Sequence, residues 1–144
     1  MSRNLTSSVD FNLAFLLLNR YRWFQRQLQP FLERMGVPEL TTTQQMIAPY
    51  LDPEGTSISE LARRVGVTRQ AIHQTVNSMV KAGFVDVVPA PHDKRLKLVR
   101  LSKLGHRVDR EAVREIHRLE AALSERLGKK TVATLRKALE EDWG

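Results

Sequence analysis

Five polar side chains recur within one short stretch of the sequence at the spacing of a single helical face. The stretch is TRQAIHQTVNSMVKAG, residues 68–83. Its outward polar residues are predicted to be Arg69, Gln70, His73, Gln74 and Asn77. Side chains of these types can present two donors, or a donor and an acceptor, to base edges in the major groove of DNA. A solvated surface is the alternative, but Lys and Glu, its usual occupants, are nearly absent from this face.

A second stretch, PHDKRLKLVRL at residues 91–101, gathers basic side chains around one carboxylate. Asp93 and Arg95 lie two residues apart, with Lys94 and Lys97 beside them. An Arg at the tip of a hairpin fits the narrow minor groove, where it senses groove width and negative potential. A nearby carboxylate can hold the planar guanidinium through charge-assisted hydrogen bonds. The alternative is an exposed ion pair without function, worth about 0 to 1 kcal/mol.

The net charge of the chain is concentrated in its middle third. Residues 57–107 hold ten Lys and Arg against three acidic residues, whereas the remainder holds thirteen of each kind. The whole formal charge of +7 therefore falls in one segment. A basic segment within a neutral scaffold is the electrostatic pattern expected of a nucleic-acid-binding protein.

Composition argues against several other classes of protein. The 144 residues contain no Cys, which excludes disulfides and thiolate metal sites and makes the cytoplasm the expected compartment. The four His residues lack metal-binding spacing, so we expect neither metal nor cofactor. We find no nucleophile with a matched base, no paired carboxylates and no phosphate-binding Gly-rich loop, so we do not expect an enzyme. No apolar run approaches the ~20 residues of a membrane span, and FNLAFLLL, residues 11–18, is interpreted as core.

The elements that must position these side chains begin at recognisable helix caps. The predicted caps are Thr41 with Gln44, Ser57 with Glu60, and Thr68. Apolar residues at helical spacing after Ser57 predict a short helix that ends at Gly66. Thr68 then begins a second helix after a tight turn. The predicted inward stripe of that second helix consists of Ile72, Val76, Met79 and Val80.

The apolar pattern then changes from helical to alternating. FVDVV, residues 84–88, and KLVRL, residues 97–101, are typical of strands. The PAPHDKR segment between them contains prolines that cannot continue a ladder. These segments predict a two-stranded hairpin. The order of helix, turn, helix and hairpin is that of a winged helix.

Two prolines complicate the helices that precede this region. A first helix should run from about residue 9 to 35, with Pro30 kinking or dividing it, because proline removes an amide donor and crowds the preceding turn. A second helix should contain Pro49 and stop at the DPEG turn.

Terminal helices carry more apolar residues than one small winged domain can cover. After the hairpin, a helix should start at Ser102, break at Gly128 and be followed by a last helix over about 130–142. The terminal apolar residues include Phe11, Phe15, Leu16, Leu123, Leu127, Leu135, Leu139 and Trp143. A dimerisation surface explains them, although a second core within one chain is the alternative.

The run from Leu40 to Gly105 resembles the MarR family of bacterial transcriptional regulators. The resemblance lies in LTTTQQ at the second helix, in SISELARRVGVTRQAIHQTVNSMVKAGFV as the helix-turn-helix, and in PAPHDKRLKLVRLSKLG as the wing. The wing is the most specific part, since the family pattern is roughly D-x-R, alternating aliphatics and L-[ST]-x-x-G. The matching positions here are Asp93, Arg95, Leu98, Leu101, Ser102 and Gly105.

The resemblance implies roles for particular residues. In the family, the wing Arg enters the minor groove and the neighbouring Asp orients it, which implies these roles for Arg95 and Asp93. The family also uses its terminal helices for dimerisation. Val87 departs from the pattern, because the family often has a basic residue at this position.

Together, these patterns predict a mainly α fold with a small antiparallel β-wing. Residues 39–102 should form a winged helix-turn-helix DNA-binding lobe, and residues 1–38 and 103–144 a helical dimerisation lobe. The predicted function is a sequence-specific transcriptional regulator, expected to be a repressor, that binds double-stranded DNA at a pseudo-palindromic operator as a homodimer. A nonspecific architectural DNA-binding protein and a winged-helix protein-interaction module are the alternatives.

Two sets of site residues follow from this prediction. The predicted DNA-contacting residues are Ser57, Thr68, Arg69, Gln70, Ala71, His73, Gln74, Asn77, Asp93, Lys94, Arg95 and Lys97. A small aromatic effector that releases the DNA is also considered, with a pocket lined by Tyr21, Trp23, Phe24, Met46 and Tyr50. The alternative for this second set is ordinary core packing.

Overall fold

The computed structural model describes residues 11–144, and the predicted helix start near residue 9 lies outside them. In chain order the elements are α1 (Leu13–Arg34), α2 (Thr42–Ile47), the 3₁₀ helix η1 (Ala48–Tyr50), β1 (Thr56–Ser57), α3 (Ile58–Val65), α4 (Arg69–Lys81), β2 (Val85–Pro89), β3 (Lys97–Leu101), α5 (Lys103–Leu127) and α6 (Lys129–Glu140). The predicted mainly α fold with a small antiparallel sheet is confirmed. The chain forms two compact units, one of residues 32–115 and one of the helical segments up to residue 31 and from 116 onward.

Side-chain caps start three of the helices in the unit of residues 32–115. Thr41 Oγ1 accepts the Gln44 amide at 3.2 Å, and Gln44 Oε1 accepts the Thr41 amide at 2.8 Å, so the predicted capping box is confirmed. Ser57 and Thr68 cap α3 and α4 in the same manner. The box predicted at Ser57 is one-sided, because the Glu60 carboxylate binds arginine side chains of α3.

The core of this unit lies beneath α3, α4 and the sheet. Ile72, Val76 and Met79 of α4 are buried, together with Leu61 of α3 and Val99 of β3. The prediction of Val80 as a core residue is wrong, because its exposed fraction is 42%. At 100° per residue, position 80 lies about 80° around the helix from position 72, at the edge of the apolar stripe.

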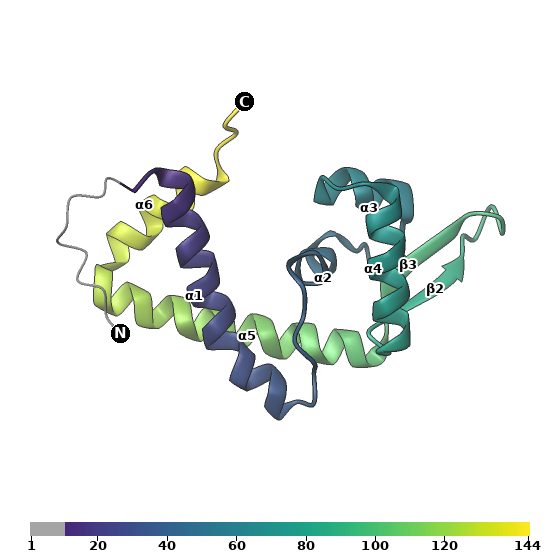
Figure 1. The fold of residues 1–144 in the computed structure, drawn as a ribbon, viewed down its shortest axis with the longest axis horizontal. Coiled ribbons are helices and arrows are strands. Elements are labelled where there is room, and N and C mark those ends of the chain that lie inside the picture. The colour runs from purple at the N-terminus through teal and green to yellow at the C-terminus, as the bar shows by residue number, and fades with distance from the viewer. Residues whose placement is uncertain (1–10) are drawn as a thin grey trace. The chain divides into compact units, whose positions relative to one another are not determined.

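The sheet has three antiparallel strands in the order β1-β3-β2, so the prediction of two strands was incomplete. Strand β1 pairs Thr56 with Val99 and Ser57 with Leu98. Two residues are too few to show an alternating pattern, so this strand has no signature in the sequence. The β2–β3 pairing runs from Val85 opposite Leu101 to Pro89 opposite Lys97. In Figure 1 the hairpin extends away from α4, with its loop at the free end.

The prediction for Pro30 is a kink or a division of the first helix, and the prediction for Pro49 is a position inside the second helix. Helix α1 runs through Pro30 to Arg34, so Pro30 does not divide it. Helix α2 ends at Ile47, and Pro49 lies in the 3₁₀ helix that follows rather than inside α2. Pro49 occupies the first turn of that short helix, where a missing amide donor costs no internal hydrogen bond.

In the other unit, α5 and α6 meet at a glycine. Gly128 has φ of 96° and separates the two helices, as predicted. Arg136 of α6 donates to Glu120 of α5 at 2.8 Å. The indole Nε1 of Trp143 donates to the Ala138 carbonyl at 2.9 Å, which holds the last residues against the end of α6.

The junction between β3 and α5 packs against the turn that joins α4 to β2. Ser102 donates its amide to the Phe84 carbonyl at 3.0 Å and its hydroxyl to the Gly83 carbonyl. The same hydroxyl accepts the Gly105 amide at 3.0 Å and so caps α5. A Cβ added at Gly105 would lie 2.0 Å from the Phe84 oxygen. Only glycine therefore allows α5 to start this close to the turn.

We expect Gly105→Ala to lower the free energy of unfolding by about 2 kcal/mol or more, because the new methyl group overlaps a backbone carbonyl. Helix propensity alone would favour alanine by about 1 kcal/mol, so the two effects have opposite signs. Thermal and urea denaturation measure the difference. Gly66→Ala is the control, since a Cβ there meets nothing within 4 Å and strains only a left-handed backbone. A Gly105→Ala protein as stable as wild type would contradict this packing.

Candidate nucleic-acid interface

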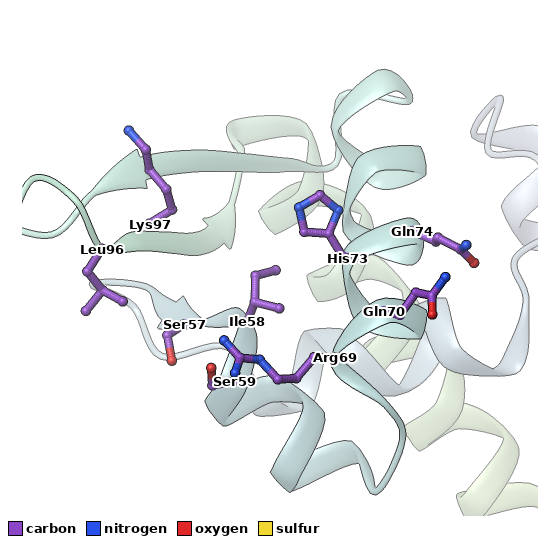
Figure 2. A pocket seen from close by; sticks show the side chains of 9 residues that line it. All are labelled: Ser57, Ile58, Ser59, Arg69, Gln70, His73, Gln74, Leu96 and Lys97. Carbon is purple, nitrogen blue, oxygen red and sulfur yellow. The ribbon is translucent and has the colours of Figure 1, made fainter.

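A groove lies between the start of α3, the exposed face of α4 and the first residues of β3 (Figure 2). The residues that line it are Ser57, Ile58, Ser59, Arg69, Gln70, His73, Gln74, Leu96 and Lys97. Two of these nine side chains are basic and none is acidic. The groove therefore offers positive charge together with amide and imidazole hydrogen-bonding groups.

The predicted polar face of α4 is exposed to solvent along its whole length. Arg69, Gln70, His73 and Gln74 all line the groove, and Asn77 is exposed one turn beyond His73. Asn77 Nδ2 lies 3.2 Å from His73 Nδ1. Of the other predicted contacts in this helix-turn-helix, Thr68 caps α4 and Ala71 is only half-exposed.

The loop between β2 and β3 is organised by Asp93. Its carboxylate Oδ1 accepts the Arg95 amide at 3.0 Å and the Arg95 Nε at 3.3 Å, and its carbonyl accepts the Leu96 amide at 3.0 Å. A hydrogen bond from a backbone amide to the side chain two residues earlier in the chain is typical of turns. The Arg95 side chain is 93% exposed. Asp93 therefore builds the turn and contacts a guanidinium that faces solvent.

The structure brings only part of the predicted wing set to the groove. Lys97, the first residue of β3, lines the groove together with α4. Asp93, Lys94 and Arg95 are exposed in the hairpin loop and are not among the lining residues. The predicted wing contacts are thus divided between the groove and the tip of the hairpin.

Sequence reasoning missed three residues that line the groove, namely Ile58, Ser59 and Leu96. Ile58 and Ser59 follow the cap residue Ser57 in the first turn of α3, so the cap itself was a signal for their position. Leu96 had no such signal, because its place depends on the turn that Asp93 forms. An exposed leucine beside basic residues can contact the methyl group of thymine.

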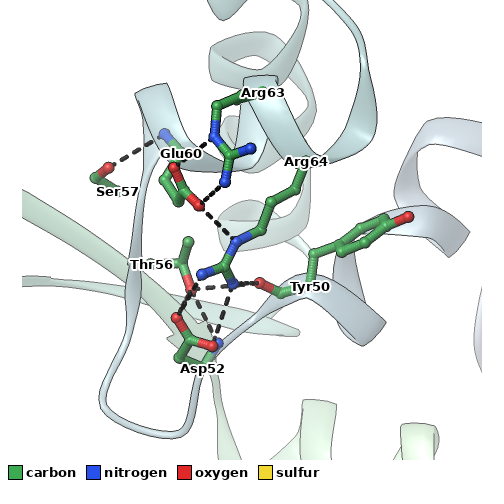
Figure 3. Close-up of polar contacts among 7 residues, drawn as sticks. All are labelled: Tyr50, Asp52, Thr56, Ser57, Glu60, Arg63 and Arg64. Carbon is green, nitrogen blue, oxygen red and sulfur yellow. Dashed lines mark hydrogen bonds and ion pairs between the residues drawn. The ribbon is translucent and has the colours of Figure 1, made fainter.

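A second missed feature is an ion-pair cluster centred on Arg64 (Figure 3). Its Nε donates to Glu60 at 2.8 Å, and its two terminal nitrogens each donate to Asp52 at 3.1 Å. One of these nitrogens also donates to the Tyr50 carbonyl at 2.9 Å. Thr56 Oγ1 accepts the Asp52 amide at 2.9 Å. The cluster ties the turn before β1 to α3, and so positions the edge of the groove that contains Ser57.

The cluster shifts the ionisation of its carboxylates. Hydrogen bonds from Arg63 and then Arg64 lower the pKa of Glu60 to about 2, against an ordinary value of 4.5. The hydrogen bond from Arg64 also lowers the pKa of Asp52. Both arginines in turn have raised pKa values.

Two structural findings bear on other kinds of site. Within residues 11–144, no three His, Asp or Glu side chains are grouped as metal ligands would be. In the same part of the chain, every helix is too short or too polar to cross a membrane. Of the predicted effector residues, Tyr21, Trp23 and Phe24 belong to α1, Met46 to α2 and Tyr50 to η1, and the pocket stays a prediction.

The lowered pKa of Glu60 predicts a specific loss of stability in acid. Because its pKa falls on folding, the Glu60 ion pairs stabilise the protein fully above about pH 4.5, and this contribution is lost as pH falls towards 2. The difference in melting temperature between wild type and Glu60→Gln should be constant above about pH 5 and shrink below it. Glu54→Gln, which changes the same turn outside the cluster, is the control. A wild-type advantage that persists undiminished near pH 2 would contradict the assignment.

Known regulators share both sequence and fold with the elements that form the groove. Residues 40–96 match the MarR family. The transcriptional regulator AdcR of Streptococcus pneumoniae is 33% identical over 72 residues, which are 50% of this chain and 49% of AdcR. The match thus spans about half the length of that relative.

Solved structures of MarR-type regulators share the fold over most of the chain. Reduced MarR from E. coli has a TM-score of 0.72 at 22% identity, covering 92% of this chain and 96% of that one. CouR from Rhodococcus jostii RHA1, bound to p-coumaroyl-CoA, has a TM-score of 0.70 at 20% identity, covering 93% and 94%. PcaV from Streptomyces coelicolor, in complex with its natural ligand, has a TM-score of 0.69 at 23% identity, covering 92% and 94%. Residues 40–96, which contain the winged helix-turn-helix, thus match the MarR family, and the chain has the fold of these regulators.

Proposed function

We propose that this protein is a sequence-specific transcriptional regulator that binds double-stranded DNA as a homodimer and acts as a repressor. The observation that carries the proposal is the groove between α4 and β3, which combines two basic residues with a row of exposed hydrogen-bonding side chains. Phosphate contacts position a protein on DNA, and base-edge contacts select the sequence. Arg69 and Lys97 suit the first task, and Gln70 and Gln74 suit the second.

Charge segregation supports DNA as the partner rather than another protein. The excess of basic residues falls within residues 57–107, the segment that also forms the groove and the wing. At the tip of the hairpin, the exposed guanidinium of Arg95 suits the minor groove. A DNA-bound regulator of this kind would work in the cytoplasm of a bacterial cell.

The homodimer is supported by apolar side chains that the monomer leaves exposed. Those on the terminal helices include Leu13, Phe15, Leu16, Leu18, Leu127, Leu135 and Leu139, with Trp143 beyond α6. The interpretation of FNLAFLLL as core is therefore wrong for Leu13, Phe15, Leu16 and Leu18. A set of exposed large apolar residues of this kind marks an association surface. Two copies related by a twofold axis would read half-sites about 34 to 36 Å apart.

The proposal also includes a small aromatic effector whose binding releases the protein from DNA. CouR and PcaV, which share the fold, were each solved with a bound ligand. Within α1 of this chain, Trp23 and Phe24 form an edge-to-face pair at 5.0 Å, and Tyr21 is exposed. Aromatic side chains of this kind line sites for small apolar ligands.

Selection of bound fragments from random duplex DNA tests the function and its symmetry together. We expect a palindromic sequence to be recovered. Gln70→Ala and Gln74→Ala should each weaken binding to it by about 1 to 3 kcal/mol and relax preference at particular bases, because each removes a group that faces the major groove. Gln27→Ala, an exposed glutamine of α1, is the matched control. Equal binding to selected and random duplexes would instead indicate an architectural DNA-binding protein.

Substitutions at the tip of the hairpin test the minor-groove contact. Asp93→Asn removes a negative charge, which on Coulombic grounds should favour DNA binding, but it also loosens the hold on Arg95. We expect Asp93→Asn to weaken operator binding, to a degree between wild type and Arg95→Ala. Arg95→Lys should recover little, since an ammonium group lacks the planar fork. Tighter binding by Asp93→Asn at physiological salt would show that DNA binding does not need the contact between Asp93 and Arg95.

Lys94→Ala is the control for a purely electrostatic interaction. Because it removes an ammonium group that would pair with a phosphate, it should weaken binding to all sequences alike, and it should reduce the slope of log affinity against log salt by about one unit. Fluorescence anisotropy titrations over a range of salt concentrations measure both effects.

A further inference from the structure

His73 and Asn77 lie one turn apart on the exposed face of α4, and their side chains form a hydrogen bond. The distance between Asn77 Nδ2 and His73 Nδ1 is 3.2 Å. An amide nitrogen can only donate, so Nδ1 of His73 must accept. In a neutral imidazole the proton then resides on Nε2, which becomes a donor.

The lining of the groove contains no acidic partner for His73. His73 lines the groove together with the cationic Arg69 and Lys97, and no carboxylate is among the nine lining residues. No carboxylate of the lining therefore competes for a donor at Nε2 of His73. Figure 2 shows the His73 ring projecting from α4 into the space between this helix and the sheet, where a bound duplex would contact it.

We propose that Asn77 is a positioning residue that fixes His73 as an Nε2–H donor for base reading. The proposal rests on the DNA-binding function given above and adds a specificity determinant to it. In the major groove, a donor pairs with guanine O6 and N7, adenine N7 or thymine O4, but not with the amino groups of cytosine or adenine. The pair therefore selects an acceptor at the contacted base edge.

DNA binding strengthens the influence of Asn77. In the free protein, water competes for the exposed ring nitrogens. When a duplex covers the face of α4, water is displaced, and hydrogen bonds become stronger in the lower dielectric. An unmatched donor or acceptor then carries a desolvation cost, so the wrong base is penalised.

Asn77→Asp is designed to reverse the tautomer. A carboxylate can only accept, so Nδ1 of His73 must then carry a proton. In the neutral ring of this variant, Nε2 then becomes an acceptor. The contacted position should then favour a base that presents an amino donor. Asn77→Ala removes the partner altogether and should leave the ring without a fixed tautomer.

The first readout is the tautomer itself, in the absence of DNA. Nitrogen-15 NMR distinguishes protonated from unprotonated ring nitrogens, and His73→Gln identifies the signals of His73 among the four histidines. We expect the proton on Nε2 in wild type and on Nδ1 in Asn77→Asp. Equal melting temperatures of the variants would show that the fold is unchanged. A proton on Nδ1 in wild type, or the same tautomer in both proteins, would overturn the proposal.

The second readout is base preference, measured by selection from random duplexes at about pH 8. Asn77→Asp should change the ratio of acceptor to donor bases by about fivefold or more at one position of each half-site, the same position at which His73→Gln loses the wild-type preference. The ratio is compared rather than the affinity, because the added negative charge weakens all binding alike. A reversed tautomer with unchanged base preference would overturn the proposal while leaving the DNA-binding function intact. If wild type selected no sequence at all, the proposed function itself would fail, whatever the ring nitrogens show.

Discussion

The Phe84 carbonyl determines how the hairpin leaves the helix that precedes it. It accepts the Ser102 amide, and it lies so close to Gly105 that no side chain fits there. The amide of the same residue donates to the Met79 carbonyl at the end of α4. The end of α4, the start of β2 and the start of α5 thus meet at one residue. Since the groove is bounded by α4 and β3, its width depends on this contact.

Ion pairs and side-chain hydrogen bonds, rather than close backbone packing, position the opposite edge of the groove. Arg64 joins Asp52, Glu60 and the Tyr50 carbonyl, and so fixes the turn that enters β1. Its side chain is partly shielded from solvent, so these contacts are screened less than those of a fully exposed pair. The wing tip differs, because Asp93 and Arg95 are both exposed. The groove is thus bounded by elements with many internal contacts, whereas the tip of the hairpin is organised by the Asp93 carboxylate.

Local signals in the sequence predicted much of this arrangement. The caps at Thr41, Ser57 and Thr68 and the stop at Gly66 were recognisable, because each depends on a side chain or a left-handed residue within a few positions. The exposed face of α4 followed from helical spacing. Features that depend on distant partners could not be predicted. Strand β1 exists only because β3 lies beside it, and Leu96 reaches the groove only because Asp93 forms the turn before it.

Ser57 belongs to two elements at once, since it is the last residue of β1 and the cap of α3. No linker residue separates the sheet from the helix at this point, so the polypeptide has no slack there. The hairpin is thus joined to α3 through Ser57, and α3 shares a buried core with α4. In the proposed dimer, an effector would therefore act on the spacing between the two copies rather than on the shape of either one.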